Sequence, residues 1–192
     1  MSTLQGCKIW LGKYSISGQS NVVGLDYGAD LKDATTFDHT TRINLGGLKS
    51  AGFGVSGFWE GTPDGELFSN IGLANVPCTF SPTTGADGQL AYVLNAISAE
   101  YAVGGPIGEN APFSIGGKGN ALVRGLVMHN ATRTATSTGV IRQLGTVSSS
   151  QKLHVALHVI TVSGTNPTLD ITIQSDALET FLSPLSRLTF AQ

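Results

Sequence analysis

The fold of this chain is decided by residues 22–60, which begin with Val22-Val23-Gly24-Leu25-Asp26-Tyr27 and end with Ser50-Ala51-Gly52-Phe53-Gly54-Val55-Ser56-Gly57-Phe58-Trp59-Glu60. Both ends have the composition of β-strands, and the second strand alternates with period two. Its shared face carries Ala51, Phe53, Val55 and Gly57. Between the strands, residues 28–48 show β-branched content but little alternation, which predicts a long inter-strand loop. Loops of this length inside a compact domain are uncommon and usually functional.

The predicted loop has the character of a contact surface and not of a reaction centre. It begins in an acidic stretch, with four aspartates and a single lysine, namely Asp26, Asp30, Asp33, Asp38 and Lys32. Their spacing lacks the alternating ligand order and the glycine of a calcium loop, so no metal site is expected. We instead expect this stretch to contact a neighbouring subunit through Asp30, Asp33, Phe37, Arg42, Ile43, Leu45 and Lys49.

Residues 8–130 resemble the N-terminal part of phage tail tube proteins. The resemblance rests on a strand followed by "DATTF" (33–37), "GGLKSAG" (46–52), a strand ending in "GFW" (57–59) and "PDGELFSNIG" (63–72). In that family the long loop between two core strands reaches the neighbouring subunit or ring. The last sixty residues follow the family pattern less well, which leaves a related virion role such as capsid decoration open.

The composition fits an assembling protein of one domain, residues 1–192. Charged residues make up only 12%, about half of the usual quarter, while 25 glycines occur. The net charge is −2, divided into −3 for residues 1–96 and +1 for residues 97–192. Without a basic patch, tight binding of nucleic acid is not expected. The sequence shows no signal peptide and no apolar run long enough for a membrane span, so we expect synthesis in a reducing cytoplasm. The resemblance implies that this is the cytoplasm of a bacterial host.

The remaining chain predicts an all-β protein, a β-sandwich or barrel of some twelve short strands, with one short helix at residues 63–71. Leu67, Phe68 and Ile71 are expected to be the buried stripe of that helix. The polar residues 129–138 are a possible internal boundary before C-terminal strands in 140–192. The other main strand and hairpin predictions are Lys8–Leu11 with Tyr14–Ile16, Phe113–Ile115 with Leu122–Met128 around the glycines 116–119, Val140–Val147, and Leu153–Ile160 with Leu169–Ile173.

No catalytic, cofactor-binding or metal-binding constellation is expected. His154 and His158 have the spacing of half a zinc site on a helix, but on a strand the same spacing separates them by about 13 Å. The alternating Val, Leu and Ile residues around them favour a strand, so both are interpreted as histidines on its polar face. Gly54-Val55-Ser56-Gly57 lies in a strand and lacks the spacing of a nucleophile elbow. An enzyme is therefore not expected.

Three functions remain open. The resemblance implies a tail tube subunit that forms stacked hexameric rings with a channel for DNA and contacts other virion proteins. A capsid decoration protein agrees with the low charge and the additional C-terminal strands. A carbohydrate-binding β-sandwich needs exposed aromatic side chains, and it is disfavoured because Trp10 and Trp59 are expected to be buried.

Overall fold

A computed structural model describes residues 4–145, 148–165, 167–178 and 180–190. Within these ranges the chain forms nine strands and one helix: β1 Lys8–Leu11, β2 Tyr14–Ser15, β3 Ser20–Asp33, β4 Asn44–Phe58, α1 Gly61–Ser69, β5 Val76–Ser81, β6 Leu90–Val103, β7 Pro112–Leu126, β8 Ile171–Ser175 and β9 Leu185–Phe190. Seven strands form one antiparallel sheet in the order β2-β1-β5-β6-β7-β4-β3, and β8 pairs with β9 in a second sheet. The all-β prediction with one short helix is confirmed.

The first hairpin agrees with its prediction, because a glycine supplies the turn. β1 and β2 pair with Leu11 opposite Tyr14, and Gly12 between them has φ of +57°. A positive φ is cheap for glycine and costly for residues with a Cβ atom, so the two-residue turn closes without strain.

The predicted loop over residues 28–48 is wrong, since most of it is strand. β3 and β4 pair from Ser20 opposite Gly57 to Asp33 opposite Asn44, with bulges near each end, and only residues 34–43 connect them. The alternation that marks a strand in sequence arises when one face is buried and the other is wet. Both faces of this part of the hairpin are exposed, so no alternation is needed and none is present.

The glycine-rich residues 116–119 are also not a turn. They lie inside β7, which runs unbroken between β4 and β6 and pairs with both. A Cβ atom on Gly117 would lie 2.2 Å from the Ile97 carbonyl oxygen and 2.6 Å from the Phe53 ring, and one on Gly119 would lie 2.3 Å from the Leu94 side chain. These glycines permit a close approach of neighbouring strands, which explains why a turn signal occurs inside a strand.

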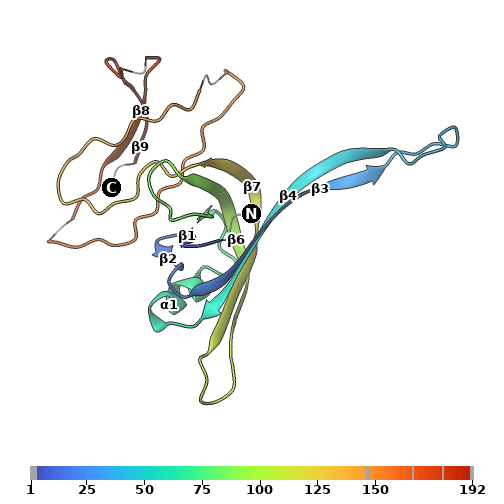
Figure 1. Cartoon of the computed structure of the whole chain (residues 1–192), viewed down its shortest axis with the longest axis horizontal. Coiled ribbons are helices and arrows are strands. Elements are labelled where there is room, and N and C mark those ends of the chain that lie inside the picture. Colours follow the sequence, from blue (N-terminus) through green and yellow to red (C-terminus); the bar gives the residue numbers. More distant parts are fainter. Residues whose placement is uncertain (1–3, 146–147, 166, 179, 191–192) are drawn as a thin grey trace.

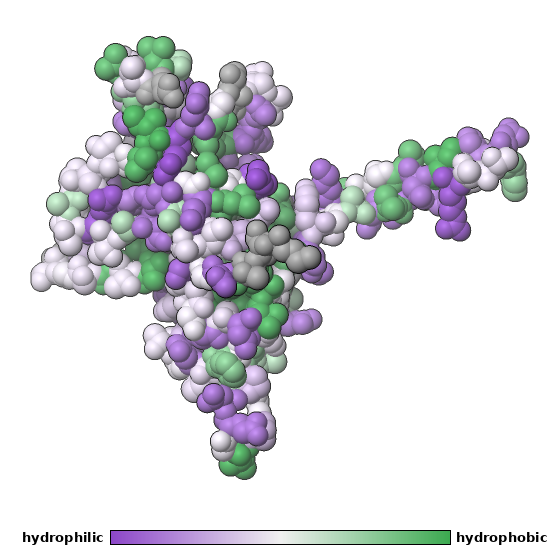
Figure 2. All heavy atoms as spheres, in the orientation of Figure 1, coloured by the Kyte–Doolittle hydropathy of each residue, from purple (hydrophilic) through white to green (hydrophobic). Residues whose placement is uncertain are grey.

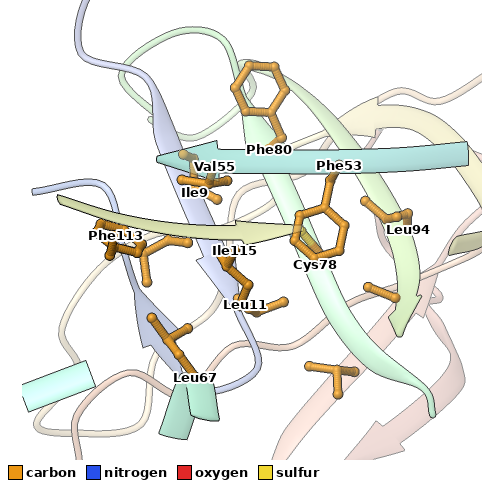
Figure 3. Packing of buried hydrophobic residues seen from close by; sticks show 13 residues of the cluster. Ile9, Leu11, Phe53, Val55, Leu67, Cys78, Phe80, Leu94, Phe113 and Ile115 are labelled. Atoms are coloured by element: carbon orange, nitrogen blue, oxygen red, sulfur yellow. The ribbon is translucent and has the colours of Figure 1, made fainter. Parts of the chain in front are cut away.

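The main core is a cluster of buried side chains between the bent sheet and α1 (Figure 3), and a small second cluster contains Trp10, Ala91 and Val127. The main cluster contains Ile9, Leu11, Ile16, Phe53, Val55, Leu67, Val76, Cys78, Phe80, Leu94, Ala96, Phe113 and Ile115. The same long sheet supplies residues on several sides of this cluster, which is the sandwich-like packing that the sequence predicted.

The helix and the tryptophans differ in part from their predictions. α1 spans Gly61–Ser69, so it begins and ends two residues earlier than predicted. Leu67 is buried, whereas Phe68 and Ile71 are exposed. Trp10 is buried as expected, but Trp59 is 44% exposed, because its indole N–H donates a 2.8 Å hydrogen bond to Asp64 at the surface of α1.

The predicted hairpin of Leu153–Ile160 with Leu169–Ile173 is wrong. The described residues between Leu126 and Ile171 contain neither helix nor strand, and β8 pairs with β9 instead. The strand predicted for residues 140–147 is absent over its described part, residues 140–145. The strands predicted at 140–147 and 153–160 are not found in the described residues, and the single strand β7 replaces two predicted strands. The number of strands is therefore nine and not the predicted twelve. The division of the chain at residues 129–138 stays a prediction.

His158 holds the segment around it against the seven-stranded sheet, and it is not on a solvated strand face. In its neutral form the ring donates from Nδ1 to the Gly12 carbonyl at 2.7 Å and accepts from the Thr79 hydroxyl at Nε2, also at 2.7 Å. The ring stacks on Trp10 with centroids 6.3 Å apart. Burial lowers the pKa of His158, partly offset by the bond to Gly12. The neutral ring is therefore the docked form.

Acidification is expected to loosen this segment. Because the pKa of folded His158 lies below that of the unfolded chain, about 6.5, the stability it contributes is complete above that value. It is lost as the pH falls through the lowered pKa of the folded state. Hydrogen exchange of residues 153–160 from about pH 7.5 to about pH 5 measures this. His158→Gln should remove the dependence, and His154→Gln, which changes an exposed neighbour, should retain it. Equal pH profiles for the two variants would contradict the assignment.

Candidate subunit interface

The distal part of the β3–β4 hairpin, residues 26–50, projects from the body as an arm (Figure 1). Every residue of this arm is exposed except Ala34 and Ile43, which are half-buried. An arm of this length whose two faces both meet water buries almost no apolar surface of its own chain. The hydrophobic effect of the arm therefore contributes almost nothing to the folding stability of the isolated subunit.

The tip of the arm is nevertheless an ordered turn. The Ala34 N–H donates to the Ile43 carbonyl at 2.8 Å, and the His39 N–H donates to the Thr36 carbonyl at 3.1 Å. The Thr35 hydroxyl oxygen accepts the Ile43 N–H at 2.9 Å. These bonds continue the hairpin to its end, so the backbone of the arm is hydrogen-bonded up to its tip.

Four of the seven predicted contact residues carry charge, and each has an interaction partner on the arm. Asp30 pairs with Lys32 and Asp33 pairs with Arg42, each at 3.6 Å. The Thr35 hydroxyl and N–H hold the pKa of Asp33 below its ordinary value. Lys49 lies 6.0 Å from the centre of the Tyr27 ring. Arg42 and Lys49 thus have partners within their own arm, and their predicted contacts with aspartates of another copy remain a prediction.

The apolar side chains of the arm have little contact with their own chain. Phe37 at the tip is fully exposed, Leu45 is 58% exposed and Leu48 is 84% exposed. Leu31 and Tyr27 are also exposed, and Figure 2 shows apolar residues interspersed with polar ones along the arm. Several large apolar side chains exposed on one projecting element are typical of a protein-binding surface. The sequence predicted this property for Phe37 and Leu45, and it missed Leu31 and Leu48.

Several strand edges of the large sheet lack partners among the described residues, and two of them belong to the long strands β3 and β6. β3 is the last strand of the sheet, so its outer edge is free along its whole length. β6 pairs with β5 only as far as Ala96. Beyond the single bridge between Ser98 and Ile71, the edge of residues 99–103 is free as well. The strands β6, β7, β4 and β3 therefore form a four-stranded unit with an open edge on each side.

A groove of about 710 Å³ runs along the free edge of β6, lined by Phe68, Ile71, Ala99, Glu100, Tyr101, Ala102 and Ser114. Asp64 of α1 fixes its wall, because the carboxylate accepts hydrogen bonds from the Tyr101 hydroxyl and from Trp59. These bonds lower the pKa of Asp64. Burial, followed by the bond to Asp64, raises the pKa of Tyr101 to about 12. Tyr101 therefore stays protonated as a donor, and the groove keeps its shape.

Reaction chemistry is not built into the described residues. No three His, Cys, Asp or Glu side chains among them converge on a possible metal position. Burial raises the pKa of the Cys7 thiol and raises that of Cys78 to about 12, so neither is a ready nucleophile. Within the described part of the chain, no helix is both long and apolar enough to cross a membrane. The surface features that remain are the arm, the edges and the groove.

The arrangement of these elements is similar to that in solved tube structures. A chain from the virion of a native gene transfer agent particle is 14% identical with a TM-score of 0.53, over 65% of this chain and 99% of that chain. The SPP1 tail tube is 11% identical with a TM-score of 0.53, over 63% and 77% of the two chains. This chain has the fold of phage tail tube proteins. No protein-family model matches it, and no curated protein matches it in sequence.

The tail tube fold accounts for about two thirds of the chain. The sheath/tube terminator of an extracellular contractile injection system, PVC, is 15% identical with a TM-score of 0.53, and the match covers 96% of that chain but 65% of this one. That share is about the length of the segment from Lys8 to Leu126. About a third of this chain therefore lies outside the match with each of these three structures.

Proposed function

We propose that this chain is a tail tube subunit, a non-catalytic structural protein of a virion that assembles into stacked rings around a channel for DNA. The observation that carries the proposal is the four-stranded unit of β6, β7, β4 and β3 with one free edge on each side. The similarity to tube structures supports the same function. A free edge of 14 residues is a hazard in a monomer, since it pairs readily with other strands.

Pairing of the two edges between copies closes a ring. The β3 edge of one copy and the β6 edge of the next are different surfaces, so their contact is head-to-tail, and such contacts form closed rings when the rotation per subunit fits. The four long strands then continue from subunit to subunit as one barrel wall. The groove along β6 lies at this seam and receives side chains of the neighbouring β3. A hexamer is the ring size that the resemblance implies.

The arm reaches beyond its own ring to the next one and contacts it through Asp30, Asp33, Phe37, Arg42, Ile43, Leu45 and Lys49. Exposed ion pairs contribute at most about 1 kcal/mol each. Full burial of a side chain such as Phe37 or Leu48 contributes about 1.5–3 kcal/mol. The apolar residues therefore supply most of the association energy, and the charges select the partner.

The low net charge of the subunit suits the wall of a channel through which DNA passes. The chain carries a net charge of −2, and affinity for DNA grows with the number of phosphates that lysine and arginine neutralise. A nearly neutral subunit lets DNA pass without sequence-specific binding. The protein is made in the cytoplasm of the bacterial host and functions in the virion alongside other virion proteins.

Mass measurement of the purified full-length protein tests the ring. We expect a species of about six times the 19.9 kDa subunit mass, or multiples of it. A rise in protein concentration should convert rings to longer stacks, and sedimentation measures this conversion. A protein that remains monomeric at every soluble concentration would contradict the proposal, and a trimer that binds capsids but forms no tubes would point to a decoration protein.

A further inference from the structure

The part of the chain between β7 and β8 contains a segment without strand partners among the described residues. In residues 153–159 the larger apolar side chains Leu153, Val155, Leu157 and Val159 alternate with His154, Ala156 and His158, and Leu153, Ile160 and Val162 are exposed. No backbone hydrogen bond joins residues 152–165 to any other residue that the structure describes. Backbone N–H and C=O groups are strong hydrogen-bonding groups that proteins satisfy wherever water is excluded. A segment with strand alternation and unpaired backbone groups can pair with the free edge of an existing sheet.

Charge is distributed unequally between this region and the arm. Residues 127–169, which follow β7, contain three basic residues and no acidic one, namely Arg133, Arg142 and Lys152. The ion pairs of the described residues include none of these three. Residues 26–38 on the arm carry four aspartates and one lysine. The two surfaces are therefore complementary in charge, and both carry exposed apolar side chains.

One copy does not bring these surfaces together. Figure 1 shows the arm on one side of the body and the region around β8 and β9 on the opposite side. His158 further holds its segment beside β1 and β5, which are at the end of the sheet opposite to β3. The contact that charge and apolar surface favour is therefore a contact between two copies.

We propose that residues 153–162 of one copy add as a β-strand to the free β3 edge of the arm of a second copy. Main-chain hydrogen bonds then satisfy both unpaired edges. Lys152 and His154 face the aspartates of the arm, while Ile160 and Val162 cover its exposed leucines. The inference rests on the proposed assembly of the chain with itself. It adds a contact made by residues between β7 and β8, which locks each arm after it has reached the next ring.

Disulfide trapping between two differently tagged full-length proteins tests this pairing. Both carry Cys7→Ser to remove the half-buried native thiol, and Cys78 stays because it is fully buried. One protein carries Leu31→Cys on the arm. The other carries a single cysteine at one of the positions 156–162. A disulfide forms only where Cα atoms come within about 7 Å. Strand pairing predicts mixed disulfides at alternate positions, because successive side chains of a strand point to opposite faces.

The matched control is Ile107→Cys, a fully exposed position in the loop between β6 and β7, paired with the same arm cysteine. If the heterodimer yield exceeds that of the control at alternate positions, the inference is supported. If the yield equals that of the control at all positions, the inference is wrong. Asp30→Lys with Asp33→Lys should lower the initial trapping rate by about fivefold, and an unchanged rate removes the electrostatic part of the argument.

Mass measurement of the same samples without oxidant separates this inference from the proposed function. Rings without mixed disulfides mean that the tube function holds and the C-terminal strand addition is wrong. Absence of both rings and mixed disulfides overturns both. Circular dichroism of each cysteine variant shows whether the fold is kept, and all these positions are at least partly exposed.

Discussion

Replacing residues 28–48 by a short glycine-serine turn is expected to give a protein that folds normally and no longer forms tubes. The deleted arm contributes no residue to the core cluster, and the remaining β3–β4 pairing from Tyr27 opposite Ala51 to Ser20 opposite Gly57 is intact. Closing a shorter connection changes the loop entropy by less than about 1 kcal/mol. The thermal melt should therefore stay cooperative, while electron microscopy should show at most isolated rings.

Point variants refine this test. Phe37→Ser removes the fully exposed side chain at the tip of the arm, and Ile107→Ser removes one of equal exposure from the β6–β7 loop. We expect the first to raise the concentration needed for tubes by about tenfold or more, as loss of 1.5–3 kcal/mol of burial at each contact requires. The second should have little effect. Normal tubes from the shortened protein would show that the arm is dispensable, and an unfolded product would place the arm in the core.

Gly117→Ala is expected to destabilise the fold strongly, although it adds a single methyl group. The new Cβ atom would lie 2.2 Å from the Ile97 carbonyl oxygen and 2.6 Å from Phe53. A backbone oxygen of a central strand cannot move aside without breaking the pairing of β6 with β7. We expect a loss of about 3 kcal/mol or more in the free energy of unfolding, at the upper end of overpacking effects.

Gly125→Ala in the same strand is the matched control, because no atom lies within 4 Å of its Cβ position. Urea unfolding of both variants measures the difference. Gly125→Ala should change the free energy of unfolding by about 0.5–1 kcal/mol in the stabilising direction, since alanine restricts the unfolded chain. Equal stabilities of the two variants would show that β6 and β7 do not approach as closely as described.

The sequence predicted those elements whose two faces differ in environment. Phe53 and Val55 alternate with exposed or small residues because β4 buries one face there, and the period of two follows directly. The β1–β2 hairpin was predictable because its turn depends on Gly12, which lies directly between the two strands. The helix was predictable from Pro63 and its neighbours, but the exposure of Phe68 was not, because it depends on the open edge of β6 beside it.

Other elements left no local signal. The arm has the sequence of a loop because both of its faces are exposed to water, so strand pairing imposes no alternation on residues 26–50. Gly117 and Gly119 resembled a turn because the close approach that requires them involves Leu94 and Ile97, which are distant in sequence. Residues 153–159 have strand alternation but no strand partner in the part of the chain that the structure describes.

The candidate interface was predictable only in part. Apolar residues such as Phe37 and Leu45 in an acidic stretch indicated contact with another molecule, and both are exposed in the structure. The free edges of β3 and β6 were not predictable, because the order of strands in a sheet arises from pairing across long sequence separations. In the proposed function the free edges join subunits within a ring, and the arm residues contact the next ring.

Cryo-electron microscopy of the assembled full-length protein tests the central claim most directly. We predict a tube of stacked rings whose wall is a continuous β-barrel, with the β3 edge of each subunit hydrogen-bonded to residues 99–103 of β6 in the next. The arm of each subunit should extend to the adjacent ring. An assembly in which β3 or β6 remains unpaired, or a particle without a central channel, would contradict the account.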